Sequence, residues 1–98
     1  MDVLLKKSPN KNKKWRVTLP NGSHVNFGAS GYQDYTMHHD PKRKELYKIR
    51  HKARENWTMK GINKAGFWSR WLLWEKPTMS GAKKFMKTKF GISLATER

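Results

Sequence analysis

The sequence predicts an α+β fold, with an N-terminal β-hairpin followed by three helices around a tryptophan-rich core. Two early stretches alternate apolar and polar residues around an Asn-Gly pair, three later stretches have helical or continuously apolar patterns, and five tryptophans can fill a small interior. A chain of 98 residues suits one domain. We expect a basic arm over residues 1–13 and a single domain over 14–98.

The hairpin is expected in "KWRVTL" (14–19) and "HVNFG" (24–28). Asn21-Gly22 between them is a strong signal for a tight hairpin turn. The apolar positions of both stretches share one face: Trp15, Val17, Leu19, Val25 and Phe27. A lone hairpin is marginally stable in water, so this face should be covered by the helices.

Three helices should follow. The first runs from Pro41 to about Asn56, with Asp40 as its cap, and its stripe is Leu46, Ile49, Ala53 and Trp57. The second is "FWSRWLLW" (67–74), apolar nearly all round and therefore central. The third covers about 79–90, between a Thr78 cap and Gly91. The predicted core comprises Trp15, Phe27, Leu46, Ile49, Trp57, Phe67, Trp71, Leu72 and Phe85.

The charge predicts an anionic partner. Lys and Arg number 22 against 7 Asp and Glu, giving +15 spread along the chain. Nucleic acid, an acidic protein surface or anionic lipid could neutralise it, and the alternative is a solubilising surface without a defined site. The best candidates for phosphate or other anion contact lie in the basic helix 41–56 and in the basic segment 7–16. They are Lys11, Lys13, Lys14, Arg16, Lys42, Arg43, Lys44, Lys48, Arg50, Lys52 and Arg54.

Little in the sequence suggests catalysis. There is no cysteine, which suits synthesis in the cytosol or nucleus, and no apolar run long enough to span a bilayer or resemble a secretory signal. No pair of carboxylates, phosphate-binding glycine loop or set of histidines has catalytic or metal-binding spacing. We therefore expect no enzyme activity, metal, cofactor or small-molecule substrate. The rings of Tyr32, Tyr35 and Tyr47 are expected to pack rather than stack on bases.

The chain resembles a family of small proteins encoded by large nucleocytoplasmic DNA viruses. The resemblance lies in "FGASGYQDYT", Asp40 before a basic segment, Arg50-His51, Trp57 and "GFWSRWLLWEKPT", and it spans residues 27–91. The basic loop "MKGINKAG" departs from the pattern, and the N-terminal arm lies outside it. The family has no assigned activity, so the resemblance implies a viral setting, with the protein made in the host cytoplasm or nucleus, and no mechanism.

Two functions remain. The preferred one is a structural component of a virus particle, a minor or internal capsid protein that contacts other virion proteins. Its anchors would be Leu4, Leu5, Trp68 and Trp74, and the arm 1–13 has too few apolar residues to fold alone, so it should dock, extended, on a neighbouring subunit. The alternative is a DNA-binding or genome-packaging protein that contacts phosphates through helix 41–56 and the arm.

Overall fold

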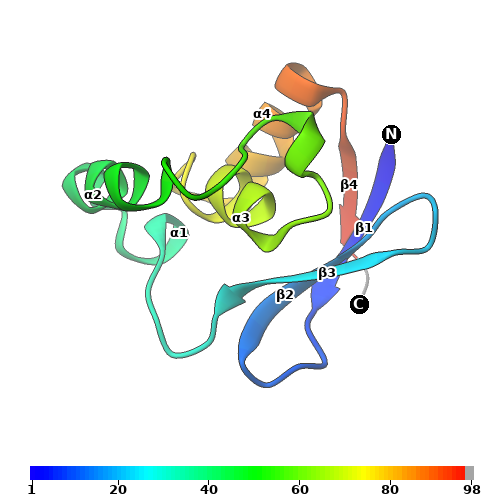
Figure 1. The fold of residues 1–98 in the computed structure, drawn as a ribbon, viewed down its shortest axis with the longest axis horizontal. Coiled ribbons are helices and arrows are strands. Elements are labelled where there is room, and N and C mark those ends of the chain that lie inside the picture. Colours follow the sequence, from blue (N-terminus) through cyan, green and yellow to red (C-terminus); the bar gives the residue numbers. More distant parts are fainter. Residues whose placement is uncertain (97–98) are drawn as a thin grey trace.

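The computed structural model of the protein describes residues 1–96, which form a four-stranded sheet with helices over one face (Figure 1). The strands are β1 (Asp2–Lys7), β2 (Lys13–Thr18), β3 (His24–Ala29) and β4 (Ser93–Thr96), in the spatial order β3-β2-β1-β4. The α+β class, the early hairpin and the aromatic interior are confirmed.

Strands β2 and β3 are the predicted hairpin. They pair antiparallel, with Trp15 opposite Phe27 and Val17 opposite Val25. Gly22 in the turn has φ +87°, a conformation in which glycine is favoured because a Cβ would be strained. The Asn-Gly signal therefore located the turn correctly.

The N-terminal segment is an inner strand of the sheet. Strand β1 pairs antiparallel with β2 on one side and parallel with β4 on the other. Val3 and Leu5 are fully buried, whereas Leu4 points outward and is half exposed. The prediction that residues 1–13 make few contacts with their own domain is therefore wrong. Alternation places two of the three aliphatic side chains in the core, and both edges of the strand find hydrogen-bonding partners.

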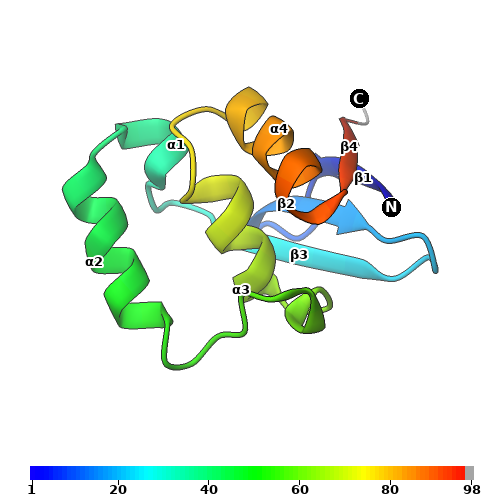
Figure 2. The same cartoon turned by 90° about the horizontal axis from the view of Figure 1, so that it is seen from above.

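The helical elements connect and cover the sheet. They are α1 (Tyr35–His38), α2 (Pro41–His51), the 3-10 turn η1 (Met59–Gly61), α3 (Ala65–Trp68), the π-helical turn η2 (Ser69–Leu73) and α4 (Met79–Phe90). Figures 1 and 2 show α2 at one end of the molecule, away from β1 and β4. Between α2 and α4 lies the α3–η2 segment.

Local capping explains where the longer helices begin. The carboxylate of Asp40 accepts a hydrogen bond from the Lys42 amide at 2.9 Å, and the Thr78 hydroxyl accepts one from the Gly81 amide at 3.0 Å. Helix α4 has its predicted bounds and ends at Gly91, whose φ is +68°. Helix α2 ends at His51, five residues before the predicted end.

The core lies between the sheet and helix α4, with α3–η2 at its centre. Phe67, Trp68, Leu72 and Leu73 from this segment are fully buried. They meet the apolar face of the sheet on one side and Ala82, Met86 and Ile92 on the other. The prediction that residues 67–74 are central is confirmed, although the segment is a short α-helix continued by a π-helical turn.

Two predicted core residues on α2 are exposed. Leu46 and Ile49 are 52% and 72% exposed, so their assignment to the core is wrong. Helix α2 instead buries Tyr47, whose ring stacks on Trp74 with centroids 4.3 Å apart. That aromatic contact sets the rotation of the helix about its axis and turns the aliphatic stripe away from the body. The remaining predicted core aromatics are only partly buried: Trp15, Trp57, Trp71 and Phe85.

Arg70 is the charged residue at the centre of this layer. It is 4% exposed, and its guanidinium lies 4.4 Å from the Trp71 ring centroid and 5.2 Å from that of Trp57. Glu75 accepts a hydrogen bond from its Nη2 at 3.1 Å. The carboxylate of Glu75 and the two tryptophan rings stabilise this buried charge. The bond to Glu75 links η2 to the segment that leads into α4.

Candidate functional site

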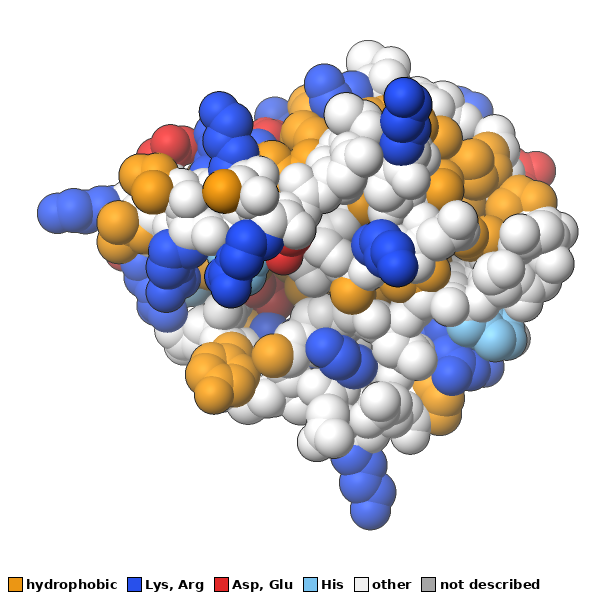
Figure 3. Space-filling model, in the orientation of Figure 1, with side chains coloured by type: hydrophobic (Ala, Val, Ile, Leu, Met, Phe, Trp, Pro, Cys, Tyr) orange, Lys and Arg blue, Asp and Glu red, His pale blue; other side chains and the backbone are white. Residues whose placement is uncertain are grey.

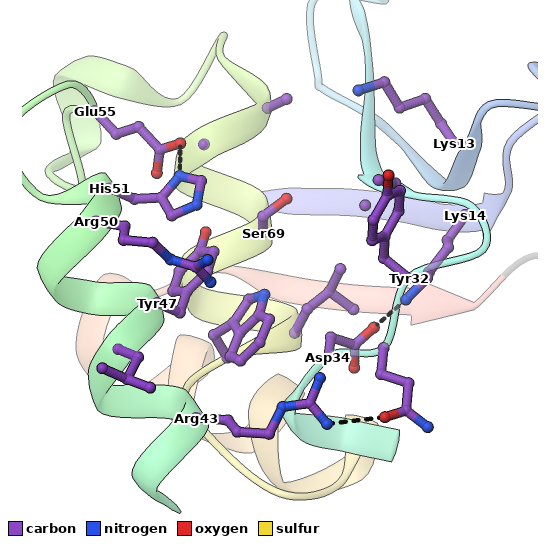
Figure 4. A pocket seen from close by; sticks show the side chains of 18 residues that line it. Lys13, Lys14, Tyr32, Asp34, Arg43, Tyr47, Arg50, His51, Glu55 and Ser69 are labelled. Atoms are coloured by element: carbon purple, nitrogen blue, oxygen red, sulfur yellow. Dashed lines mark hydrogen bonds and ion pairs between the residues drawn. The ribbon is translucent and has the colours of Figure 1, made fainter. Parts of the chain in front are cut away.

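A cleft of about 730 Å³ separates helix α2 from the start of β2 and the loop after β3. Residues of α3 and η2, including Ser69 and Leu73, form its floor. Figure 4 shows the two walls facing each other, with the α2 side chains on one side and Tyr32, Asp34, Lys13 and Lys14 on the other. The cleft therefore joins segments that are far apart in the sequence.

The α2 wall follows from helical spacing. Its side chains occur at intervals of three and four residues and so occupy one face: Arg43, Leu46, Tyr47, Arg50 and His51. Arg43 donates from Nη1 to the Gln33 side-chain oxygen at 2.9 Å, which links the two walls across the cleft mouth (Figure 4). Within residues 1–96, Arg50 makes no side-chain hydrogen bond or ion pair. Its guanidinium is available to a ligand.

The opposite wall is organised by Asp34. This carboxylate is 3% exposed, caps α1 by accepting from the Thr36 amide at 3.0 Å, and lies 2.6 Å from the Lys14 ammonium. Lys14 is thus neutralised within the protein. In the described part of the chain Lys13 has no side-chain partner, and Tyr32 lines the cleft with 72% of its surface exposed.

Glu55 closes one end of the cleft. One of its oxygens lies 2.9 Å from Nδ1 of His51, and the other accepts from the Trp57 indole N–H at 2.9 Å. Gly66 leaves room for it, because a Cβ there would lie 2.7 Å from the Glu55 Cδ. Both carboxylates that line the cleft are therefore paired inside the protein.

The ring of Tyr47 in the α2 wall is closed to stacking by a ligand. Tyr47 is 5% exposed and lies between Trp74 and His51, each with ring centroids 4.3 Å away. Burial raises the pKa of Tyr47, with a smaller contribution from Glu55, so the phenol stays protonated. Among the described residues that line the cleft, Tyr32 is therefore the exposed aromatic ring.

The electrostatic result is a cleft that suits an anion. Four Lys or Arg side chains line it against two carboxylates, and both carboxylates are occupied. Figure 3 shows further Lys and Arg side chains over the face that carries α2. No cluster of three metal-ligating side chains occurs within residues 1–96. The arrangement can bind a charged ligand.

The predicted anion contacts fall into two groups. Lys13, Lys14, Arg43 and Arg50 meet in the cleft, and the others lie elsewhere. Two of those others are held by acids, since Lys44 lies 3.4 Å from the Glu75 carboxylate and Lys48 lies 3.4 Å from the Glu45 carboxylate. Arg16 donates to the Asn26 side chain on the sheet. The exposed group comprises Lys11, Lys42, Lys52 and Arg54.

The predicted protein-contact anchors are placed differently. Leu5 and Trp68 are fully buried in the core of their own chain, so their prediction as anchors is wrong. Leu4 is half exposed on the sheet, and Trp74 is partly buried in the stack on Tyr47. Sequence reasoning missed Tyr32 as a site residue by expecting its ring to pack. The neighbouring Gly31, at φ +84°, was the available signal for a loop that presents the ring to solvent.

Fold and cleft together define a small basic α+β protein with a cleft lined by Lys and Arg side chains beside a helix. The chain belongs to DUF5754, a family of unknown function, whose model matches residues 3–51, half of the chain. Membership of a family without assigned activity was expected. The N-terminal arm was expected to lie outside the family resemblance, but the match begins at residue 3, within β1. No curated protein and no solved structure matches the chain.

Among the residues described, no helix is both long enough and apolar enough to cross a membrane.

Proposed function

We propose that this protein binds nucleic acid and has no catalytic activity of its own. The observation that carries the proposal is the convergence of Lys13, Arg43 and Arg50 on one cleft in which both carboxylates are already paired. A Lys or Arg side chain that forms no ion pair within the protein remains free to attract an anion from solution. Phosphodiester groups are the anions that such Lys and Arg clusters most commonly bind.

The charge outside the cleft supports a polyanion over a small anion. The chain carries +15, and exposed cations continue beyond the cleft at Lys42 on α2 and at Lys52 and Arg54 just after this helix. A single small anion would neutralise only a fraction of this charge. A nucleic acid strand that enters the cleft can continue past it and meet the outer cations.

The position of the N-terminal segment reverses the preference between a particle component and a nucleic-acid-binding protein. Docking of a free arm on a neighbouring subunit was the main reason to prefer a particle component. Because Val3 and Leu5 belong to the core of the same domain, that reason is gone. The cleft supports nucleic-acid binding without it.

Fluorescence anisotropy tests the proposal. Labelled single-stranded and duplex DNA of mixed sequence are titrated with protein between about 50 and about 300 mM salt, and log affinity should fall linearly with log salt. Arg43→Gln with Arg50→Gln should lower the slope by about 1.5, since each phosphate contact contributes about 0.7 for a single strand and about 0.9 for a duplex. Absence of binding to any nucleic acid at the lowest salt, or affinity independent of salt, would refute the proposal.

A second candidate function is favoured by the exposed side chains of Leu46 and Ile49 on α2. Adjacent exposed aliphatic residues with cations around them suit contact with a neighbouring protein. We propose as this alternative a structural role in a particle of a large DNA virus, the setting implied by the resemblance over residues 27–91. Quantitative mass spectrometry of purified particles of the encoding virus should then find the protein at a fixed ratio to the shell protein, and absence would exclude the role.

A further inference from the structure

We infer that the cleft accepts a single strand and excludes a duplex, with one base stacked on Tyr32. The inference rests on the proposed function and names the class of nucleic acid that the same site takes. Three features carry it: the shape of the cleft, the open ring of Tyr32 and the spacing of the cations.

The shape selects a thin chain. Proteins that read a duplex insert a protruding helix or ribbon into a groove about 12 Å wide. Here the unpaired cations line a concave surface of about 730 Å³ in a molecule of 35 × 28 × 25 Å. A duplex is too wide to enter a cleft of this size, whereas a nucleotide falls within the range of ligands that such volumes hold.

Tyr32 supplies the base contact. Its ring lines the cleft and is 72% exposed, on a loop fixed by the buried carboxylate of Asp34. Figure 4 shows the ring on the wall opposite α2, on the same side of the cleft as Lys13 and Lys14. Tyr47, the other tyrosine of the cleft, is already covered on both sides by rings. One base should therefore stack, and because every base has a π-face the contact should be tolerant of sequence.

The cations suit phosphates on both sides of that base. Arg43 and Arg50 are seven residues apart on α2, about 10 Å along the helix axis, and Lys13 faces them from the other wall. A strand whose base lies on Tyr32 would thus have its backbone between two cationic walls. DNA and RNA share this chemistry, and a ribose hydroxyl distinguishes them.

The test compares equal lengths of oligothymidylate, oligouridylate and a hairpin duplex by anisotropy at low salt. We expect at least about tenfold tighter binding of a single strand than of the duplex. Tyr32→Ala should weaken single-strand binding by about 5- to 100-fold, while Tyr32→Trp retains it. A preference for oligothymidylate or for oligouridylate identifies DNA or RNA as the natural ligand, and either preference supports the inference.

The charge test uses two matched triple variants. Lys13→Gln, Arg43→Gln and Arg50→Gln remove three cations from the cleft, whereas Lys11→Gln, Lys42→Gln and Lys52→Gln remove three exposed cations outside it. Both sets lower the net charge equally, so a difference in affinity between them reports the position of the cations and not the total charge. The cleft set should lose about tenfold more affinity for the single strand. Unchanged circular dichroism melts of each variant exclude unfolding as the cause.

Ultraviolet cross-linking of the bound strand, followed by mass spectrometry, gives an independent readout and should place the adduct on Tyr32. Duplex binding as tight as single-strand binding would overturn the inference, and so would equal losses in the two triple variants or wild-type affinity of Tyr32→Ala. The proposed function would survive these results as long as salt-dependent nucleic-acid binding is seen. Failure to bind any of the three probes would refute both.

Discussion

Leu5→Ala tests whether β1 is an integral strand of the sheet. The Leu5 side chain is 0% exposed and lies opposite Val17 in the β1–β2 pairing. Removing a fully buried leucine costs about 2–5 kcal/mol, because the transfer free energy is lost and a cavity remains. For 98 residues, unfolding entropy near 60 °C is about 0.2 kcal/mol/K, so the midpoint of thermal unfolding should fall by about 10–25 °C.

Leu4→Ala is the matched control, one position along the same strand. Leu4 is 46% exposed on the outer face, and its truncation should change the free energy of unfolding by less than about 0.5 kcal/mol. Circular dichroism and tryptophan fluorescence during urea and thermal unfolding measure both variants. Small and equal effects of the two substitutions would refute the packing described for β1 and would restore the idea of a free N-terminal arm.

Two further perturbations probe the surroundings of the cleft. Gly66→Ala should destabilise the fold by about 1–3 kcal/mol in the same unfolding assays, because the new Cβ would lie 2.7 Å from the side chain of Glu55. A variant as stable as the wild type would show that the Glu55 carboxylate can move freely. Burial, followed by the nearby charge of Arg43, lowers the pKa of His38 below its ordinary value near 6.5, and its Nδ1 accepts a hydrogen bond from the Asp40 amide. The stabilisation of the folded state by the neutral His38 ring is complete above pH 6.5 and is lost as the pH falls below that value toward the lower pKa of the folded state. The midpoint of thermal unfolding should therefore fall more for the wild type than for His38→Gln over this pH range. Parallel pH profiles of the two proteins would refute the destabilising effect of protonating His38.

Local signals predicted the parts of the fold that depend on neighbouring residues. Asp40, Thr78 and Gly91 mark helix ends because capping bonds join residues two to four positions apart. The same holds for the Asn-Gly turn. Strands β1 and β4 escaped prediction because they pair residues about ninety positions apart, as with Val3 beside Leu94, and no local pattern encodes that pairing.

The candidate site shows the same division. The Lys and Arg residues of α2 could be named from composition, and four of the predicted contacts do line one cleft. The side of the helix that faces inward could not be predicted from its aliphatic stripe, because stacking of Tyr47 on Trp74 decides it. The pairing of Asp34 with Lys14 could not be predicted either, and it determines which cations are left for a ligand.

The extent of the family match bears on how the cleft should be tested in relatives. Residues 3–51 include both cationic walls and Tyr32, whereas the floor from Ser69 to Trp74 lies outside the match. If the cleft binds a strand, the walls make the contacts, and the floor only has to hold α2 at its distance from the sheet. Relatives with different floor residues should therefore bind single strands as long as they keep an aromatic ring and unpaired cations on the walls. A relative that keeps the fold but places acids at the positions of Lys13, Arg43 and Arg50 should not bind, and its salt-dependent binding of single strands would contradict the role assigned to the cleft.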